Sequence, residues 1–285
     1  MNELKVGVKL AGFPHPVDIY APAGATRALV VLHGGSGRNY LIANSLGINL
    51  TTDPPTSTAV NWTWLAAQKL IAVFPQGQTI PEAPSSFTWN NHAMVSGQDD
   101  QAFLVALAAY TRSTYGVSKV AVAGHSMGGT MVNRMWCQSP TTFDAHIALA
   151  GPASAYFLGV GTACQPSTPA PYMGIIGSSD TIMQTGAGWD VPTWVISPLV
   201  SKTAAFVNDT VVAEWAQHQR RAGLRCAQSP LLADKQVSGQ VETWSHCNGS
   251  IVVRQVLNAD HGINSLEARA GKSMVDYIVE FMGAP

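Results

Sequence analysis

The amino-acid sequence predicts an α/β fold, with a mostly parallel central sheet and helices on both of its faces. Short apolar runs of strand length alternate with segments of helical periodicity, which is the pattern of parallel α/β folds. Hydrophobic residues make up 46% of the 285 residues, which is enough for one large core. The sequence contains no internal repeat, low-complexity tract or interdomain linker. A single domain is therefore expected over residues 1–285.

The predicted strands are short apolar runs that end at glycine, proline or polar residues. The first strand runs into His33-Gly34-Gly35, the second is stopped by Pro75, and the fifth leads into a Gly-Ser-Ser-Asp turn. In chain order, the strands are expected over residues 28–32, 70–74, 119–123, 145–149, 172–176 and 251–257.

The predicted helices lie between these strands, and two of them begin at residues that cap helices well. Asn61 is the candidate N-cap of the first helix, and Asp99 or Asp100 that of the second. Within the second helix, Phe103 and Leu107 are spaced to face the core. In chain order, the helices are expected over residues 61–69, 99–115, 130–138, 211–222 and 264–282, the last as one long C-terminal helix.

Two segments do not follow this rhythm of strands and helices. Residues 153–170 are rich in glycine, serine, threonine and proline, and residues 181–207 carry tryptophans without clean periodicity. Both follow strands at the edge where parallel sheets place their binding sites. We interpret both as substrate-facing loops, and the second as a loop or small cap. The alternative for the second is an irregular segment packed onto the core by its tryptophans.

The charge composition argues against two classes of partner. Charged residues are only 12% of the chain, the net charge is −1, and there is no basic block, so nucleic-acid binding is not expected. No apolar run reaches the roughly 18 residues of a membrane-spanning helix. The first residues do not resemble a signal peptide, which leaves a cytosolic protein or one whose leader has been removed. A monomer is expected.

The most informative motif is a Gly-x-Ser-x-Gly pattern at residues 124–128, between a predicted strand and a predicted helix. In this context the pattern is typical of a nucleophile elbow, a sharp turn that exposes the hydroxyl of Ser126 at the edge of the sheet. Bulky side chains in place of the two glycines would clash at such a turn. The alternative is a glycine-rich turn with an inactive serine.

A serine nucleophile needs a base to accept its proton, and the base needs an acid to orient it. In this class of fold the chain order is serine, acid, histidine. Asp180 and His261 each follow a predicted strand, so we expect them to complete a triad with Ser126. The competing acids are Asp190 and Asp209, and the competing bases are His218 and His246. His125 is expected to point away from the serine into neighbouring structure.

Acyl transfer also needs N–H donors for the oxyanion that develops in the transition state. Met127, directly after the serine, is expected to supply one backbone N–H. The loop after the first predicted strand, His33-Gly34-Gly35-Ser36, is expected to supply the other from Gly35, with Ser36 as the weaker candidate. The alternative is that this loop is an ordinary glycine-rich strand exit.

The four cysteines form no Cys-x-x-Cys pair, so a zinc ribbon or a thioredoxin-like site is not expected. Closure of short local loops favours the disulfides Cys137–Cys164 and Cys226–Cys247 among three possible pairings. The alternative is four buried, reduced thiols.

Beyond these motifs, the chain resembles the poly(3-hydroxybutyrate) depolymerase-like esterases, a branch of the α/β-hydrolases that includes feruloyl and acetylxylan esterases. The resemblance runs from about residue 28 to residue 261. The chain departs from the family at His125, where many of these enzymes have Leu or Met, and directly after His261, where many have Trp-Pro. The matching motifs are Val31-Leu32-His33-Gly34, Phe74-Pro75-Gln76-Gly77, Thr88-Trp89-Asn90, Asp99-Asp100-Gln101-Ala102-Phe103-Leu104, the serine motif, Trp136-Cys137-Gln138-Ser139-Pro140 and Gly177-Ser178-Ser179-Asp180.

The resemblance implies an α/β-hydrolase fold and a secreted or periplasmic serine esterase that acts on small or polymeric carboxylic esters. It further implies local disulfides and no metal or organic cofactor. Trp89 becomes a candidate wall of the substrate cleft, and Trp194 and His33 are further candidate substrate contacts. Two other functions remain open, a peptidase or amidase on the same scaffold and a non-catalytic binding protein.

Overall fold

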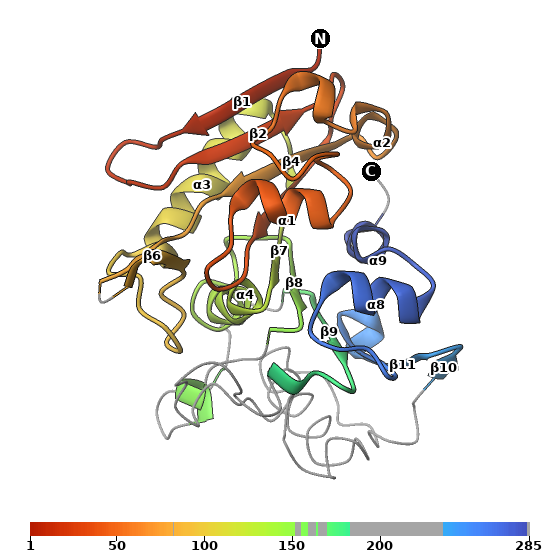
Figure 1. Ribbon diagram of the computed structural model, residues 1–285. Helices are drawn as coiled ribbons and strands as arrows, with labels where there is room; N and C mark the ends of the chain where they lie inside the picture. Colours follow the sequence, from red (N-terminus) through yellow and green to blue (C-terminus); the bar gives the residue numbers. More distant parts are fainter. Residues whose placement is uncertain (82, 152–154, 159–163, 165–169, 183–235, 284–285) are drawn as a thin grey trace.

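A ten-stranded sheet runs through the described part of the molecule (Figure 1). The computed structural model describes residues 1–81, 83–151, 155–158, 164, 170–182 and 236–283. Across the sheet the strands follow the order β1 (Glu3–Val8), β2 (Val17–Ala21), β4 (Leu70–Pro75), β3 (Arg27–Leu32), β7 (Lys119–His125), β8 (Ala145–Leu149), β9 (Tyr172–Gly177), β12 (Ile251–Val256), β11 (Val241–His246) and β10 (Gln236–Ser238).

The six central strands, from β4 to β12 across the sheet, are parallel and are the six that the sequence predicts. Their register aligns Leu32 with Gly124 and Val256 with Gly177, so that the carboxyl ends of β3, β7, β9 and β12 meet at one edge. Antiparallel strands extend the sheet on both sides, and these were not predicted. β1 has no buried residue, which explains why it lacks the apolar run that marks the central strands.

Helices cover both faces of the sheet, as predicted. Residues of α1 (Asn39–Ser45), α2 (Trp62–Ala67), α8 (Ile263–Ala270) and α9 (Met274–Phe281) pack in the core on one face. Residues of α3 (Asp100–Tyr115) and α4 (Met127–Gln138) pack on the other. β3 serves both cores, because Leu29 and Val31 face one side and Ala28 and Val30 the other.

Smaller elements connect these layers. They are the hairpin of β5 (Gln78–Ile80) and β6 (Ala83–Thr88), and the short 3₁₀ turns η1 (Ser57–Ala59), η2 (Ala155–Leu158) and η5 (Cys247–Gly249). The helix predicted over residues 211–222 lies outside the described residues.

Helix α3 shows how local sequence sets the ends of an element. The Asp99 side chain accepts a hydrogen bond from the backbone N–H of Ala102, and Gly116 ends the helix in the left-handed conformation. Phe103 and Leu107 are fully buried, as their spacing predicts. Burial of each of these side chains stabilises the fold by roughly 1.5–3 kcal/mol.

The C-terminal segment corrects the prediction of one long helix over residues 264–282. It forms two helices, because Gly271 ends α8 at a φ of 66° and Ser273 starts α9. The Ser273 side chain accepts a hydrogen bond from the backbone N–H of Asp276, which is the usual N-cap interaction. Both helices keep an apolar face against the same core. The helical spacing of apolar residues therefore continues across the break, which is why the sequence predicts one helix.

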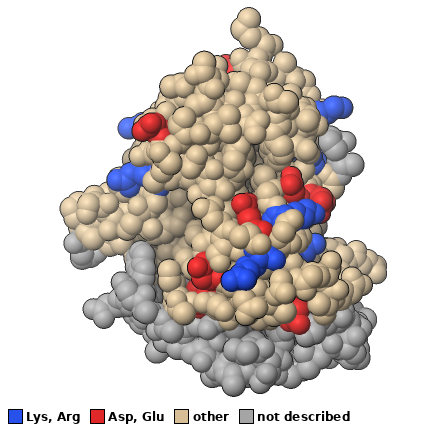
Figure 2. Space-filling view, turned by 45° about the vertical axis from the view of Figure 1, so that its right-hand side comes forward, with Lys and Arg blue, Asp and Glu red and all other residues tan. Residues whose placement is uncertain are grey.

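Charged side chains are sparse on the surface. On the face shown in Figure 2, uncharged residues cover most of the described surface, and several of the basic and acidic side chains lie next to one another. This distribution agrees with the net charge of −1. Within the described residues, no helix has the length and apolar character needed to cross a membrane.

Candidate active site

Ser126 lies on a sharp turn between β7 and α4. The strand continues to His125 and the helix begins at Met127, so the turn is tighter than the sequence pattern predicts. Ser126 has a φ of 56° and a ψ of −121°, a backbone conformation that is unfavourable for a non-glycine residue by about 1–3 kcal/mol. Its N–H donates to the carbonyl of Leu149 at 2.9 Å, which ties the turn to β8. The serine side chain is therefore presented from a rigid, strained backbone.

The two glycines of the motif are required by close backbone approach. A Cβ atom at Gly124 would lie 2.4 Å from the carbonyl of Gly128, and one at Gly128 would lie 2.4 Å from the carbonyl oxygen of Leu32. Contacts this short do not occur between real atoms, so larger residues would force α4 away from β3 and β7.

Asp180 and His261 come together at the ends of the neighbouring parallel strands β9 and β12. The Nδ1 atom of His261 lies 2.8 Å from Oδ2 of Asp180, whose side chain is fully buried. A carboxylate can only accept, so Nδ1 carries the proton and Nε2 is left to accept one from a nucleophile. A Cβ atom at Gly177 would lie 2.3 Å from the carbonyl oxygen of Ala259, so only glycine at this position lets the two loops approach so closely.

Ser126 and His261 line the same cavity, which has a volume of about 430 Å³. Of the three residues that the sequence predicts as a triad, Asp180 and His261 are thus in direct contact, and Ser126 lines the same cavity as His261. Two competing acids and one competing base, Asp190, Asp209 and His218, lie outside the described residues. The cavity is lined by His33, Gly34, Gly35, Gly37, Arg38, Leu41, Ile42, Ser45, His125, Ser126, Ile182, His261, Gly262, Ile263 and Asn264.

His125 belongs to the site, contrary to the expectation that it points away. Its Nε2 atom donates a hydrogen bond to the backbone carbonyl of His261 at 2.9 Å, and the two rings lie 4.9 Å apart. Burial, and to a smaller extent the nearby ring of His261, lower the pKa of His125 to about 4. His125 is therefore a neutral donor that positions the loop of His261. Because this contact spans 136 residues, no local sequence signal could have revealed it.

The candidate oxyanion donors are the backbone N–H groups of Met127 and Gly35. Met127 is the first residue of α4, and Gly35 lines the cavity. Among the described residues, no acceptor is found for the N–H of either one. The N–H of Ser36, in contrast, donates to the carbonyl of Phe87 at 2.7 Å and is not available to a substrate. The geometry thus favours Gly35 over Ser36.

His33 lines the cavity, but its side chain faces the protein. The N–H of Gly77 donates to Nε2 of His33 at 2.9 Å, and the Nδ1 of His33 lies 2.6 Å from the carbonyl oxygen of Gly34. Gln76 connects His33 to α1. Its Nε2 atom lies 2.8 Å from Nε2 of His33, and its Oε1 atom accepts a hydrogen bond from the backbone N–H of Asn39. Because the side chain is buried and both ring nitrogens are engaged, His33 stabilises the loop of residues 33–36 and is not free to make the expected substrate contact.

Trp89 also departs from its expected role as a wall of the cleft. Its side chain is fully buried in the core beside α3 and α4, and it is absent from the cavity lining. Its indole N–H donates to the carbonyl of His33 at 2.9 Å. Trp89 therefore supports the loop of residues 33–36 from the core. Trp194, the other tryptophan expected in the cleft, lies outside the described residues.

The buried imidazole of His33 predicts a specific dependence of stability on pH. Burial lowers the pKa of His33 from its ordinary value of 6.5 to about 4. Between these values the unfolded chain binds more protons than the folded protein, so the free energy of unfolding falls as the pH drops. The gap between the two pKa values corresponds to about 3 kcal/mol.

We expect the free energy of unfolding, measured by urea titration at pH 6.5 and pH 4.5, to fall more in the wild type than in His33→Gln. The glutamine amide stays neutral at both values, so the variant lacks this contribution, and the difference between the two losses should be about 2–3 kcal/mol. The carboxylates titrate in both proteins, so their contribution cancels when the two losses of unfolding free energy are compared. Equal losses would show that His33 is not held neutral by burial.

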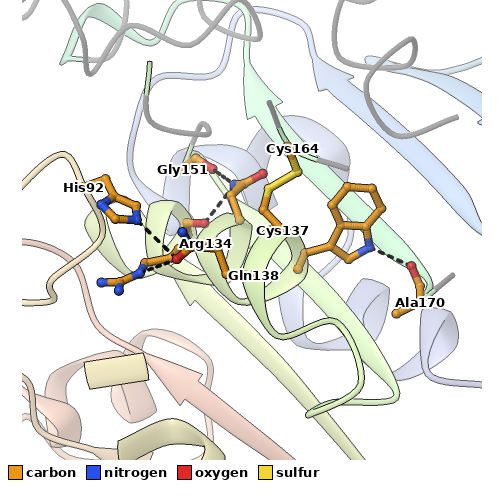
Figure 3. Close-up of a disulfide and its surroundings, with 10 residues drawn as sticks. His92, Arg134, Cys137, Gln138, Gly151, Cys164 and Ala170 are labelled. Carbon is orange, nitrogen blue, oxygen red and sulfur yellow. Dashed lines mark hydrogen bonds between the residues drawn. A yellow bond between two sulfur atoms is a disulfide. The ribbon is translucent and has the colours of Figure 1, made fainter. Parts of the chain in front are cut away.

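A disulfide fixes the far end of the helix that follows Ser126 (Figure 3). Cys137 near the end of α4 is bonded to Cys164, one of the two predicted pairs. Trp136 donates from its indole N–H to the carbonyl of Ala170, and Arg134 bonds to Gln138. On the chain-entropy model, closing a loop of 27 residues stabilises the fold by about 3.5 kcal/mol. The second predicted pair depends on Cys226, which lies outside the described residues.

Comparisons with known proteins place the fold. No family model and no curated protein matches the sequence. Among solved structures, esterase PE8 is 14% identical with a TM-score of 0.52, and 92% of this chain covers 97% of that one. A carboxylesterase from Mesorhizobium loti is 12% identical with a TM-score of 0.51, covering 100% of this chain and 99% of that one. Acyl-protein thioesterase 2 from Zea mays is 13% identical with a TM-score of 0.50, covering 94% and 99%. At these identities the likeness shows the fold, which is that of the α/β-hydrolases.

Proposed function

We propose that this protein of α/β-hydrolase fold is a serine esterase that hydrolyses carboxylic esters through an acyl-enzyme. The observation that carries the proposal is the pairing of buried Asp180 with His261 at a cavity that also contains Ser126. The strained turn at Ser126 adds support, as do the backbone N–H groups of Met127 and Gly35, which have no acceptor among the described residues. Three of the solved structures with this fold carry the names esterase, carboxylesterase and thioesterase.

In the first half of the proposed reaction, the hydroxyl of Ser126 attacks the ester carbonyl and Nε2 of His261 accepts its proton. The carbonyl oxygen becomes an oxyanion that accepts hydrogen bonds from the N–H groups of Gly35 and Met127, each worth about 3 kcal/mol of barrier lowering. The imidazolium that forms is stabilised by Asp180. His261 then returns the proton to the leaving alcohol as the C–O bond breaks.

In the second half, water attacks the acyl-enzyme while His261 again accepts a proton. The oxyanion forms at the same two N–H groups. As it collapses, the bond between the acyl carbon and Oγ of Ser126 breaks, and His261 returns its proton to Oγ, which releases the carboxylic acid and restores the hydroxyl. Each step uses groups of this chain together with the ester and water. His125 takes no proton in this scheme, because its low pKa keeps it neutral and its Nε2–H group donates a hydrogen bond to the carbonyl of His261.

The cavity favours esters of modest size with apolar parts. Leu41, Ile42, Ile182 and Ile263 form an apolar wall, and contact with it gains roughly 25 cal/mol for each Å² of apolar surface removed from water. A volume of about 430 Å³ fits a small ester or the end of a polymer chain. We therefore propose acetyl, aromatic or hydroxyalkanoate esters, including polyesters, as in the depolymerase and feruloyl esterase branch that the sequence resembles.

A peptidase or amidase on the same scaffold is the alternative, and matched substrates separate the two. We compare the ratio of the enzymatic rates for 4-nitrophenyl acetate and 4-nitroacetanilide with the ratio of their uncatalysed rates. We expect the enzymatic ratio to be larger by a factor of at least about 10³. A fluorophosphonate probe should label Ser126 with a 1:1 stoichiometry. Preferential hydrolysis of the anilide, or labelling at another residue, would contradict the proposal.

We also propose that the protein works in an oxidising compartment, as a secreted or periplasmic enzyme. The disulfide between Cys137 and Cys164 supports this, because such bonds persist mainly outside the reducing cytosol.

A further inference from the structure

We propose that Arg38 forms an anion subsite in the cavity, so that the preferred substrates are esters that carry a free carboxylate. This inference rests on the proposed esterase function and goes beyond it by naming the charge of the substrate. Arg38 lines the same cavity as Ser126 and His261, and it follows the loop of residues 33–36, three residues after Gly35.

The guanidinium of Arg38 is held in place by its neighbours. It stacks over the ring of Phe87, with 4.0 Å between the guanidinium carbon and the ring centroid. Its Nη1 atom donates to the carbonyl of Gly37 at 3.3 Å. Stacking leaves the edge of the planar group free, and a guanidinium has five N–H donors, of which this contact uses one. The remaining donors suit the two oxygens of a carboxylate, which Arg binds in a bidentate manner.

No negative charge offsets Arg38 within the described lining of the cavity. It is the one lining side chain there that carries a permanent charge. The two histidines His33 and His125 are neutral, because burial lowers the pKa of each to about 4. Within the described residues Arg38 forms no ion pair, whereas the surface residue Arg112 pairs with Asp144 at 2.9 Å.

The position of Arg38 against an apolar wall strengthens its effect on a bound anion. The side chain is half-buried, and Leu41 and Ile42 line the cavity next to it. A charge pair in such a partly dry site interacts more strongly than one in bulk water. The wall would hold the apolar part of an ester while the guanidinium holds its carboxylate. A purely structural role for Arg38 would need only the stacking on Phe87 and would give no preference for charged esters.

The test compares anionic esters with neutral analogues of the same shape. On the acyl side, the pair is 4-nitrophenyl hydrogen adipate and 4-nitrophenyl methyl adipate. On the alcohol side, it is 4-acetoxybenzoate and its methyl ester. We expect kcat/KM of the wild type to favour the anionic member of at least one pair by about 10-fold to 100-fold, the range of one charge-assisted contact.

Two variants of Arg38 test whether this side chain causes the preference for anionic esters. Arg38→Gln should reduce the ratio of anionic to neutral kcat/KM to about one or below, and Arg38→Lys should retain part of it. Arg269→Gln is the matched control, because it removes an equal charge from an exposed site on α8 outside the cavity lining, and it should leave the ratio unchanged. Loss of preference at high ionic strength should accompany the wild-type result.

The outcomes separate this inference from the proposed function. Hydrolysis of the neutral esters without any preference for the anionic ones would overturn the anion subsite and leave the esterase in place. A preference that survives in Arg38→Gln would also overturn it, because the carboxylate would then bind elsewhere. Failure of the wild type to hydrolyse any of the four esters, without labelling at Ser126, would instead contradict the esterase itself.

Discussion

Replacement of Ser126 by alanine should reduce kcat/KM for 4-nitrophenyl acetate by a factor of about 10⁴ to 10⁶, because the members of a triad act as a unit. Without the hydroxyl no acyl-enzyme can form, and the Gly35 and Met127 N–H groups can only assist direct attack by water. The measurement is steady-state hydrolysis with highly purified protein, together with mass spectrometry after treatment with a fluorophosphonate. The probe adduct should be present in the wild type and absent from Ser126→Ala.

The fold should survive this substitution with little change in stability. Ser126 has a positive φ that alanine tolerates no better, but the side chain is small in both cases and α4 keeps its contacts. Circular dichroism and thermal melting of the variant should resemble those of the wild type. Ser113→Ala, at an exposed position on α3, is the matched control and should be fully active. Near-normal turnover in Ser126→Ala would reject this serine as the nucleophile.

Asp180→Asn should lower kcat by about 10⁴, the loss seen for the equivalent change in serine proteases. Asparagine has nearly the shape of aspartate, but its amide can donate to Nδ1 of His261, which stabilises the tautomer that cannot accept the proton of Ser126. The negative charge that stabilises the imidazolium is lost as well. The measurement is kcat for a small acetate ester, with labelling by a fluorophosphonate as a second readout of nucleophilicity.

Asp260→Asn provides the control for this prediction. Asp260 precedes His261 in the chain, but it is exposed and its Oδ1 atom accepts from the N–H of Gly262 instead of the imidazole. This variant should keep activity within a few-fold of the wild type. If Asp260→Asn were inactive and Asp180→Asn active, the assignment of Asp180 as the acid would be wrong.

The amino-acid sequence by itself determined the central part of the fold and the order of the candidate triad. Six parallel strands were predictable because each is an apolar run with a clear stop, and such runs are recognised locally. The strand, serine and helix around Ser126 are equally local, since their close packing demands glycine at 124 and 128. Asp180 and His261 followed from chain order and from their places after strands.

The weaker strands and the break near the C-terminus were not predictable by the same means. β1 has no buried residue, so it carries no apolar run. The helix over residues 264–282 was predicted as continuous because its apolar periodicity persists on both sides of Gly271. A single glycine and a capping serine were enough to divide it, and their effect depends on the backbone conformation at one turn.

Only the tertiary structure decided which side chains line the cavity. Trp89 was expected in the cleft because it is aromatic, yet it lies in the core and binds the carbonyl of His33, 56 residues away. His125 was expected to point away, yet it positions the loop of His261. Arg38 was not predicted as a site residue, because a single arginine forms no recognisable sequence motif. Which way a side chain faces depends on contacts between distant segments, and these are set by packing and not by local periodicity.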